Sequence, residues 1–455
     1  MATTAENHGG SVAYVYLLAS VAALGGLLFG YDTAVISGAI GFMEEYFKLD
    51  SIQKGWVASC ALLGCILGAA GAGILSDTLG RKKVLLISAV LFTVSAVGAA
   101  VPRNVTEFVL ARILGGLGIG MASMLSPLYI AEVAPARIRG RMVSLNQLAI
   151  VSGMVVVYYV NSLIAGLGDN QWNVETGWRW MFGSGALPAM VFFVLLFLVP
   201  ESPRWLTERG REDEALDVLT RVGGRRQADL QMQEIRAVLA QETGSIAQLI
   251  QPGVRIALLI AVVLAVLQQI TGINVVLYYA PEIFKSAGVQ ATQAIGDTVA
   301  VGAVNMLFTL VAIWVVDKLG RKPLLLIGTA GMGISLALLG GAFAMEKVQG
   351  PWVLAFTLCY VASFAMAMGP VVWVIMAEIF PTQIRGRAMS IATVCLWMAC
   401  YAVSQTFPWM LKNLEGPLTF WFYSGMCLVA IVFVALFVPE TKGKTLEEIE
   451  RGWKG

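Results

Sequence analysis

The chain has 455 residues, of which 58% are hydrophobic and 13% charged, and its formal net charge is +2. Soluble domains usually carry about 25% charged and about 45–50% apolar residues, so this composition argues against a soluble protein. The net charge by itself says nothing about nucleic acid, and because no basic tract stands outside the loops we expect no nucleic-acid partner. The single histidine, His8, lies in a polar N-terminal tail, which argues against histidine catalysis or a zinc site.

Apolar stretches long enough to cross a bilayer recur along the whole chain. Crossing about 30 Å of hydrocarbon takes roughly 20 helical residues. The N-terminus lacks the basic segment of a secretory signal, so we expect the first stretch to remain as a span. We predict an all-α membrane protein with twelve transmembrane helices. They begin near Ala13, Trp56, Val84, Phe108, Met142, Trp178, Val254, Thr298, Leu324, Trp352, Ala388 and Leu418.

A hydrophilic insert divides these stretches into two sets of six. Residues 201–253 contain apolar positions at helical spacing between many charged ones, which is typical of amphipathic surface helices. We therefore predict an N-terminal six-helix bundle (1–200), a cytoplasmic helical linker (201–253) and a C-terminal six-helix bundle with a short tail (254–455).

Loop charge predicts the orientation. Placing the linker in the cytoplasm collects most loop arginines and lysines there, together with both termini. Cytoplasmic loops of membrane proteins carry such an excess of basic residues. We expect a multi-pass plasma-membrane protein with both termini in the cytoplasm.

The two halves repeat each other. SDTLGRKK after the second stretch returns as VDKLGRKP after the eighth, and AEVAPARIRGR after the fourth returns as AEIFPTQIRGR after the tenth. Matching motifs at matching places indicate a duplication. Parallel repeats of this kind hold the solute site between them.

Eight motifs in order make the chain similar to a known family. They are GILSDTLGRKK, LARILGGLGIG, AEVAPARIRGR, PESPRWL, QQITGINVVLYYAP, VVDKLGRKP, AEIFPTQIRGR and PETKG. The chain resembles the sugar porters of the major facilitator superfamily over nearly its full length, and its N-terminal half looks most like bacterial xylose–proton symporters. The resemblance implies the major facilitator fold and a transporter rather than an enzyme, without cofactor or metal. We expect a monomer in the lipid bilayer, with a monosaccharide and a proton as its partners.

The repeated acidic and basic residues next to the loops predict a gate. Glycine permits the tight turn before Arg81, and a carboxylate there can pair with arginine or hold a helix N-terminus. We expect Glu132 to pair with Arg139, and Glu378 with Arg385, in ion pairs that break when the inner side opens. The alternative is ordinary positive-inside charge. The predicted cytoplasmic gate comprises Asp77, Arg81, Glu132, Arg139, Asp317, Arg321, Glu378 and Arg385.

Asp32 is a carboxylate inside the first span. An intramembrane charge costs about 2.5–3.5 kcal/mol even on insertion scales, so it usually has a function. Its expected partner is Arg112 near the start of span four. Proton-coupled members of the family have aspartate at this position, so the resemblance implies that Asp32 and Arg112 couple proton movement to transport. The alternative is a static pair that fixes helix packing.

The sugar site is predicted from amides and tryptophans. Uncharged amides donate and accept hydrogen bonds, which suits sugar hydroxyls, and Thr271 with Gly272 can break span seven so that its amides face one cavity. The alternatives are interhelical hydrogen bonds for the amides and lipid contact for the tryptophans. The resemblance implies sugar binding by Gln147, Gln268, Gln269, Asn274, Asn305, Trp373 and Trp397.

Two positions depart from the family pattern. Leu396 replaces an amide, and Met154 replaces a polar residue of the xylose symporters. Both changes remove polar contacts from the predicted pocket, so the resemblance does not specify the sugar. Gly369 and Pro370, just before Trp373, predict a hinge in span ten; the alternative is a kink that serves helix packing.

The leading hypothesis is a proton-coupled importer of a monosaccharide, either a glucose-like hexose or xylose, that works by alternating access. The second is a passive sugar uniporter with the same fold. A sugar sensor that does not transport is a third, disfavoured by the short C-terminal tail.

Overall fold

The structure is a computed structural model that describes residues 11–135, 138–241, 252–345, 350–380 and 384–442. Within these residues, twelve helical segments are long and apolar enough to span a membrane, which confirms the predicted number. The side chains of Asp317 and Arg385, both predicted for the gate, lie outside the described part of the chain.

The first six spans run from α1 to the turn η2. Span six is divided into short pieces by a π-helical turn, η1. The bounds are α1 Val12–Phe47, α2 Ser51–Leu79, α3 Arg81–Ala100, α4 Val105–Val133, α5 Arg139–Ala165, α6 Asn170–Trp172, η1 Asn173–Gly177, α7 Trp178–Gly183, α8 Ala186–Leu195 and η2 Leu196–Leu198.

Three helices follow in the linker, and the last six spans come after them. Spans seven and ten are each built from two helices. The bounds are α9 Pro203–Glu208, α10 Glu212–Gly223, α11 Arg225–Gln241, α12 Pro252–Ile270, α13 Ile273–Ser286, α14 Ala291–Leu319, α15 Arg321–Ala344, α16 Gly350–Met366, α17 Met368–Glu378, α18 Arg385–Asn413 and α19 Glu415–Phe437.

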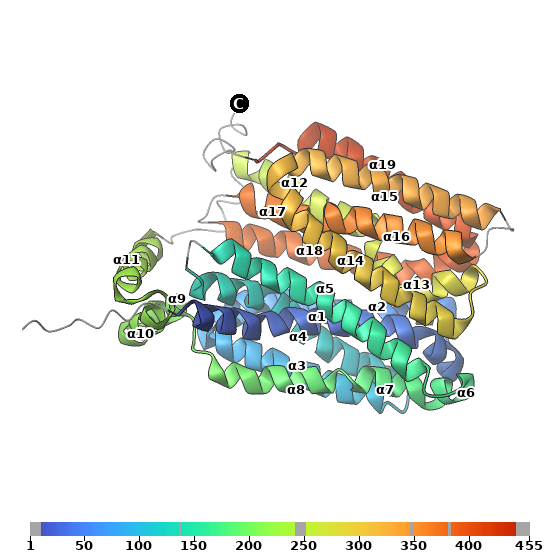
Figure 1. Cartoon of the computed structure of the whole chain (residues 1–455), viewed down its shortest axis with the longest axis horizontal. Helices are drawn as coiled ribbons and strands as arrows, with labels where there is room; N and C mark the ends of the chain where they lie inside the picture. Colours follow the sequence, from blue (N-terminus) through green and yellow to red (C-terminus); the bar gives the residue numbers. More distant parts are fainter. Residues whose placement is uncertain (1–10, 136–137, 242–251, 346–349, 381–383, 443–455) are drawn as a thin grey trace, which may run out of the picture.

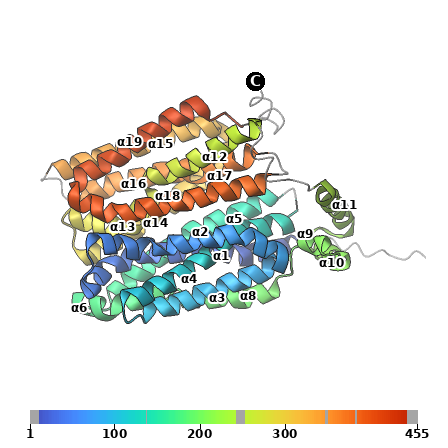
Figure 2. The same ribbon diagram turned by 180° about the vertical axis from the view of Figure 1, so that it is seen from behind.

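The two sets of spans lie side by side with their helices roughly parallel (Figures 1 and 2). Helices α9 to α11 project beyond one end of the spans, which we call the linker end; the other is the distal end. Between the sets, α2 packs against α18 and α5 against α14. These pairs form the main interface between the halves.

Local sequence explains the sharp connection between α1 and α2 at the distal end. Lys48 adopts a left-handed conformation (φ 52°) and ends α1. Asp50 then caps α2: its carboxylate accepts the backbone N–H groups of Ile52 (2.9 Å) and Gln53 (2.8 Å), and the Gln53 side chain accepts the Asp50 N–H (3.0 Å). This reciprocal capping satisfies donors that a helix start leaves unpaired.

Glycines allow α2 and α4 to touch along their backbones. A Cβ atom on Gly116 would lie 1.9 Å from the carbonyl oxygen of Ala61, and one on Gly120 would lie 2.4 Å from that of Cys65. Such spacing lets membrane helices approach closely. The contact places Arg112, one turn before Gly116, inside the first half.

Span seven breaks where the sequence predicts it. Helix α12 ends at Ile270, and Gly272 has φ +96°, a conformation that glycine adopts without the usual steric cost. A Cβ atom there would also lie 3.0 Å from the Tyr423 ring. The break lets Gln269 and Asn274 approach each other across it.

Span ten breaks two residues before the predicted hinge. Helix α16 ends at Met366 and α17 begins at Met368, with Ala367 at φ −126° and ψ −82°. Pro370 lacks an N–H and its ring would clash with the carbonyl four residues earlier, that of Met366, in a continuous helix. The bend therefore falls at Ala367 rather than at Gly369 and Pro370 themselves.

Candidate functional site

At the linker end, Arg81 joins several elements of the first half. Its Nε and Nη2 atoms each lie 3.1 Å from an oxygen of Glu132, which forms a two-point ion pair between α3 and α4. Its Nη1 contacts Asp77 Oδ1 at 3.3 Å, and Ser202 Oγ donates to Glu132 at 2.5 Å. The planar guanidinium matches a carboxylate in this geometry, so the pair fixes both helices.

The second half repeats this arrangement. Arg321 contacts Glu378 through Nη2 (2.9 Å) and Nε (3.3 Å), and Thr441 Oγ1 donates to Glu378 at 2.5 Å. Thr441 thus takes the place that Ser202 takes in the first half. The duplication inferred from sequence extends to individual hydrogen bonds.

One partner differs from the one expected. Glu132 pairs with Arg81 rather than with Arg139, whose side chain is exposed. Glu378 pairs with Arg321, and its predicted pair with Arg385 lies outside the described part of the chain. A buried guanidinium needs a carboxylate partner because water does not solvate its charge, whereas water solvates the charge of an exposed guanidinium. Arg81 is buried, so it takes Glu132.

Two further carboxylates belong to this end of the molecule. Glu201 accepts the backbone N–H groups of Arg81 (2.9 Å) and Lys82 (3.1 Å), at the start of α3. Glu440 does the same for Arg321 (3.1 Å) and Lys322 (3.0 Å), at the start of α15. A negative charge at a helix N-terminus satisfies unpaired donors and interacts favourably with the helix dipole.

The two carboxylates differ electrostatically. Burial raises the pKa of Glu201 and outweighs the effect of its hydrogen bonds to the backbone. Burial also raises the pKa of Glu440, but backbone N–H groups, including that of Lys442, lower it by more, so the net shift is downward. Neither role was predicted from the sequence, although Pro-Glu-Ser after span six and Pro-Glu-Thr after span twelve occupy matching positions in the two halves.

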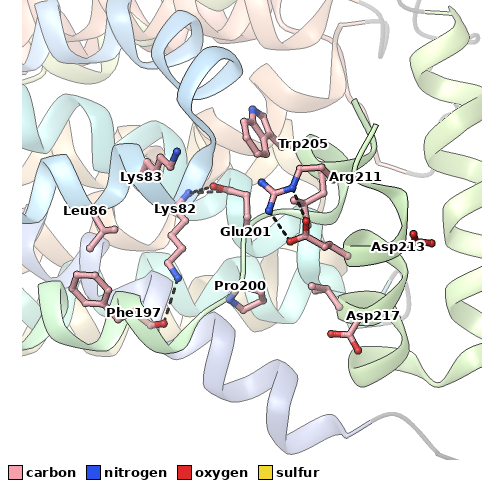
Figure 3. Close-up of a pocket in the computed structure, with 13 residues that line it drawn as sticks. Lys82, Lys83, Leu86, Phe197, Pro200, Glu201, Trp205, Arg211, Asp213 and Asp217 are labelled. Carbon is pink, nitrogen blue, oxygen red and sulfur yellow. Dashed lines mark hydrogen bonds and ion pairs between the residues drawn. The ribbon is translucent and has the colours of Figure 1, made fainter. Parts of the chain in front are cut away.

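A cavity of about 680 Å³ opens beside Glu201 at the linker end (Figure 3). It lies between the start of α3, the end of span six and helices α9 and α10, and Lys82, Phe197 and Arg211 are among its lining residues. None of the residues predicted to bind sugar lines this cavity. The case for a sugar site therefore rests on the polar side chains between the spans.

The expected partner of Asp32 is Arg112. Arg112 Nη1 lies 2.7 Å from Asp32 Oδ1, and its Nη2 donates to the Asp32 backbone carbonyl at 2.9 Å. Both side chains are largely buried between α1 and α4. The second carboxylate oxygen, Asp32 Oδ2, has no hydrogen-bond partner among the described residues. The guanidinium carbon also lies 5.3 Å from the centre of the Phe182 ring, within the range of a cation–π contact.

Three predicted amides form one hydrogen-bonded chain across the break in span seven. Asn274 Nδ2 donates to Gln269 Oε1, and Gln269 Nε2 donates to Gln268 Oε1 (3.1 Å). Gln268 Nε2 then donates to the carbonyl of Met368 (2.7 Å), which follows the bend in span ten. The chain thereby connects the two broken spans of the second half.

The remaining four predicted residues lie on four other spans. Asn305 is buried on α14, and its Nδ2 lies 3.7 Å from Met154 Sδ of α5, across the interface between the halves. Trp397 on α18 packs against Phe29 of α1, with ring centres 5.5 Å apart. Its indole N–H is buried and has no partner among the described residues.

Gln147 on α5 and Trp373 on α17 are half-buried, and the described contacts do not link them to the amide chain. The neighbour of Gln147, Asn146, is buried and packs closely against α1, because a Cβ atom on Gly26 would lie 2.6 Å from Asn146 Oδ1. Asn146 was not among the residues predicted from the sequence, although it is a polar residue inside the predicted span five.

Twelve spans in two repeated halves, with buried polar side chains at their interface, define a membrane transporter. Comparison with known proteins identifies the family. The chain matches the family described as "Sugar (and other) transporter" over residues 18–453. The chain belongs to this family of sugar transporters in the major facilitator superfamily.

Similar proteins agree in sequence and structure. The chain is 45% identical to the D-xylose-proton symporter of Escherichia coli (strain K12) over 97% of this chain and 96% of that protein. It is 43% identical to the arabinose-proton symporter of Bacillus subtilis (strain 168), again over 97% and 96%. A structure of the xylose transporter XylE from E. coli, described as a partially occluded inward open conformation, covers 95% of this chain and 100% of that one, with 44% identity and a TM-score of 0.87.

Proposed function

We propose that this protein imports a monosaccharide together with protons, by alternating access of a site between its two halves. The buried pair of Asp32 and Arg112 carries the proposal, because one carboxylate oxygen remains without a partner among the described residues and can accept a proton. Its similarity to xylose and arabinose symporters along nearly the whole chain supports a monosaccharide as the solute.

The moving bodies in this proposal are the bundles at residues 1–200 and 254–455, joined by the linker at 201–253. The excess of loop arginines and lysines at the linker end supports a cytoplasmic location for that end and both termini. The similarity to an inward open conformation of XylE supports an inward-facing state here. The pairs Arg81–Glu132 and Arg321–Glu378 at the linker end are formed and lie inside each half. In the proposed inward-facing state they are therefore not the pairs that were expected to break when the inner side opens.

The proposed sugar site comprises the amide chain Gln268–Gln269–Asn274 and the buried amide of Asn305. The unpartnered N–H of Trp397 supplies a donor, and an indole face can pack on the apolar side of a sugar ring. Gln147 and Trp373 complete the proposed set. Met154 contacts Asn305 through its thioether sulfur, which is only a weak hydrogen-bond acceptor.

Uptake into proteoliposomes tests the function. We expect radiolabelled xylose, arabinose or glucose to accumulate above equilibrium when an inward proton gradient is imposed, and to equilibrate without it. Collapse of the gradient with a protonophore is the control. Equilibration that ignores the gradient would identify a uniporter instead, and sugar binding without any uptake would identify a sensor.

The indole N–H of Trp397 has a measurable expected effect on sugar affinity. Trp397→Phe retains an aromatic ring and removes the donor, and one hydrogen bond is worth about 0.5–1.5 kcal/mol, so the Kd should rise about two- to tenfold. Isothermal titration calorimetry on the purified protein measures it. Trp421→Phe is the matched control, because its N–H donates to the Ala337 carbonyl (3.1 Å) on a lipid-facing surface. Equal affinities for both variants would remove Trp397 from the site.

A further inference from the structure

Four charged side chains of alternating sign lie together at the distal end. The Lys54 ammonium, on α2, contacts Glu44 Oε2 of α1 and Glu282 Oε2 of α13, each at 2.5 Å. The other oxygen of Glu282 contacts the Lys285 ammonium at 2.9 Å. The four charges sum to zero, and none of them belongs to the proposed sugar or proton sites.

This cluster crosses between the halves. Glu44 and Lys54 belong to the first six spans, whereas Glu282 and Lys285 belong to span seven. The Lys54–Glu282 contact therefore joins the two halves, while Arg81 and Arg321 at the linker end pair inside their own halves. The crossing pair is also sheltered, since only 10% of the Lys54 side chain and 14% of the Glu282 side chain are exposed.

The surrounding backbone is packed tightly around the pair. A Cβ atom on Gly41 of α1 would lie 2.5 Å from Lys285 Nζ and 2.7 Å from Glu282 Oε1. One turn beyond Lys54, Ser59 Oγ donates to Gln405 Oε1 of α18 at 2.9 Å, and Gln405 Nε2 donates to the Ile52 carbonyl at 3.0 Å. The distal end is thus closed by contacts from α1, α2, α13 and α18.

The order of the charges lets the halves separate without leaving a charge unpaired. If α13 moves away from α2, Lys54 keeps Glu44 and Glu282 keeps Lys285. Removing a buried charge from all its partners is strongly unfavourable, whereas losing one of two partners at a partly exposed site costs far less. The arrangement suits a contact that forms and breaks repeatedly.

We propose that Lys54 and Glu282 form a lock that holds the distal side closed in this conformation, and that breaking it opens the distal side so that sugar reaches the site from that side. The inference rests on the proposed alternating-access function. Lys54 and Glu282 are positioning residues here, because they act on the balance between conformations and do not touch the sugar.

Two substitutions separate the lock from mere stabilisation. Glu282→Gln removes the partner of Lys54 in the other half, and Glu44→Gln removes its partner in the same half; both partners lie at the same distance. We expect Glu282→Gln to increase the distal-open fraction about two- to fivefold, which corresponds to about 0.5–1 kcal/mol for an ion pair whose remaining charge keeps a second partner. We expect Glu44→Gln to leave that fraction unchanged or to lower it, because Lys54 then depends on Glu282 alone.

The measurement is the distance between spin labels at Ile52→Cys and Gln290→Cys, both exposed at the distal end, in a background without the native cysteines. Double electron–electron resonance on the purified, monodisperse protein gives the distance distribution without sugar. Equal distributions for wild type and Glu282→Gln, or equal shifts for both variants, overturn the lock. These distances are measured without any uptake assay. A failure of the lock is therefore distinguished from a failure of proton-coupled uptake in proteoliposomes.

Discussion

Asp32→Asn is expected to abolish accumulation of sugar above equilibrium while sugar exchange across the membrane continues. Asparagine has nearly the same shape as aspartate but cannot take up and release a proton. The variant therefore imitates the protonated, neutral form of Asp32 permanently. Sugar binding and the movement of the halves then proceed without a proton-linked step. The measurement is uptake driven by a proton gradient, compared with exchange of labelled for unlabelled sugar, in the same proteoliposomes.

The matched control is Asp297→Asn, which also removes a carboxylate from a membrane helix, α14, where Asp297 is half-buried. We expect this variant to accumulate sugar like the wild type. If Asp32→Asn still accumulates sugar, the proton is carried elsewhere and the Asp32–Arg112 pair serves helix packing. If exchange is lost as well, a test of folding by melting temperature distinguishes a damaged protein from a damaged mechanism.

The number and position of the spans were predictable from sequence because they depend on local properties. A membrane span requires a long apolar stretch, and each of the twelve predicted starts falls within a helix that can span a membrane. The break at Gly272 was predictable for the same reason, since glycine permits its positive φ locally. The bend at Ala367 was predicted two residues late, because proline disrupts a helix on its N-terminal side.

The partners of the charged residues were not predictable in the same way. Glu132 and Arg139 belong to one motif that recurs in both halves, and the predicted pair rested on that recurrence. Arg81 lies 51 residues before Glu132, and only the packing of α3 on α4 brings the two together. Sequence distance says nothing about such a contact unless the fold is already known.

The candidate sugar site shows the same division. Residue types and the break in span seven predicted that amides would gather there, and the structure links Gln268, Gln269 and Asn274. The bond from Gln268 to the Met368 carbonyl was not predicted, because it depends on a backbone bend in another span. This bond gives Gln268 a structural partner in the described conformation, so sugar binding there requires sharing or exchanging it.

Glu132→Gln is expected to destabilise the protein strongly, by about 3–5 kcal/mol, the range for removing one partner of a buried ion pair. Glutamine retains the size of the side chain and its oxygen can still accept from Ser202. The Arg81 guanidinium, however, remains buried against Ser76 and Asp77 without the carboxylate that contacts it at two points. The melting temperature of the detergent-solubilised protein measures the effect.

Glu378→Gln and Asp77→Asn serve as comparisons for Glu132→Gln, because each also removes a carboxylate that contacts an arginine but is more exposed to solvent. The side chain of Glu132 is 7% exposed, that of Glu378 in the second half 31%, and that of Asp77 63%. Water solvates an arginine better when its carboxylate partner is exposed, so the loss should decrease in the order Glu132→Gln, Glu378→Gln, Asp77→Asn, and the last should change stability by less than about 1 kcal/mol. An equal loss of stability for Glu132→Gln and Glu378→Gln would contradict this prediction. It would mean that burial of the ion pair does not determine how much the pair contributes to stability.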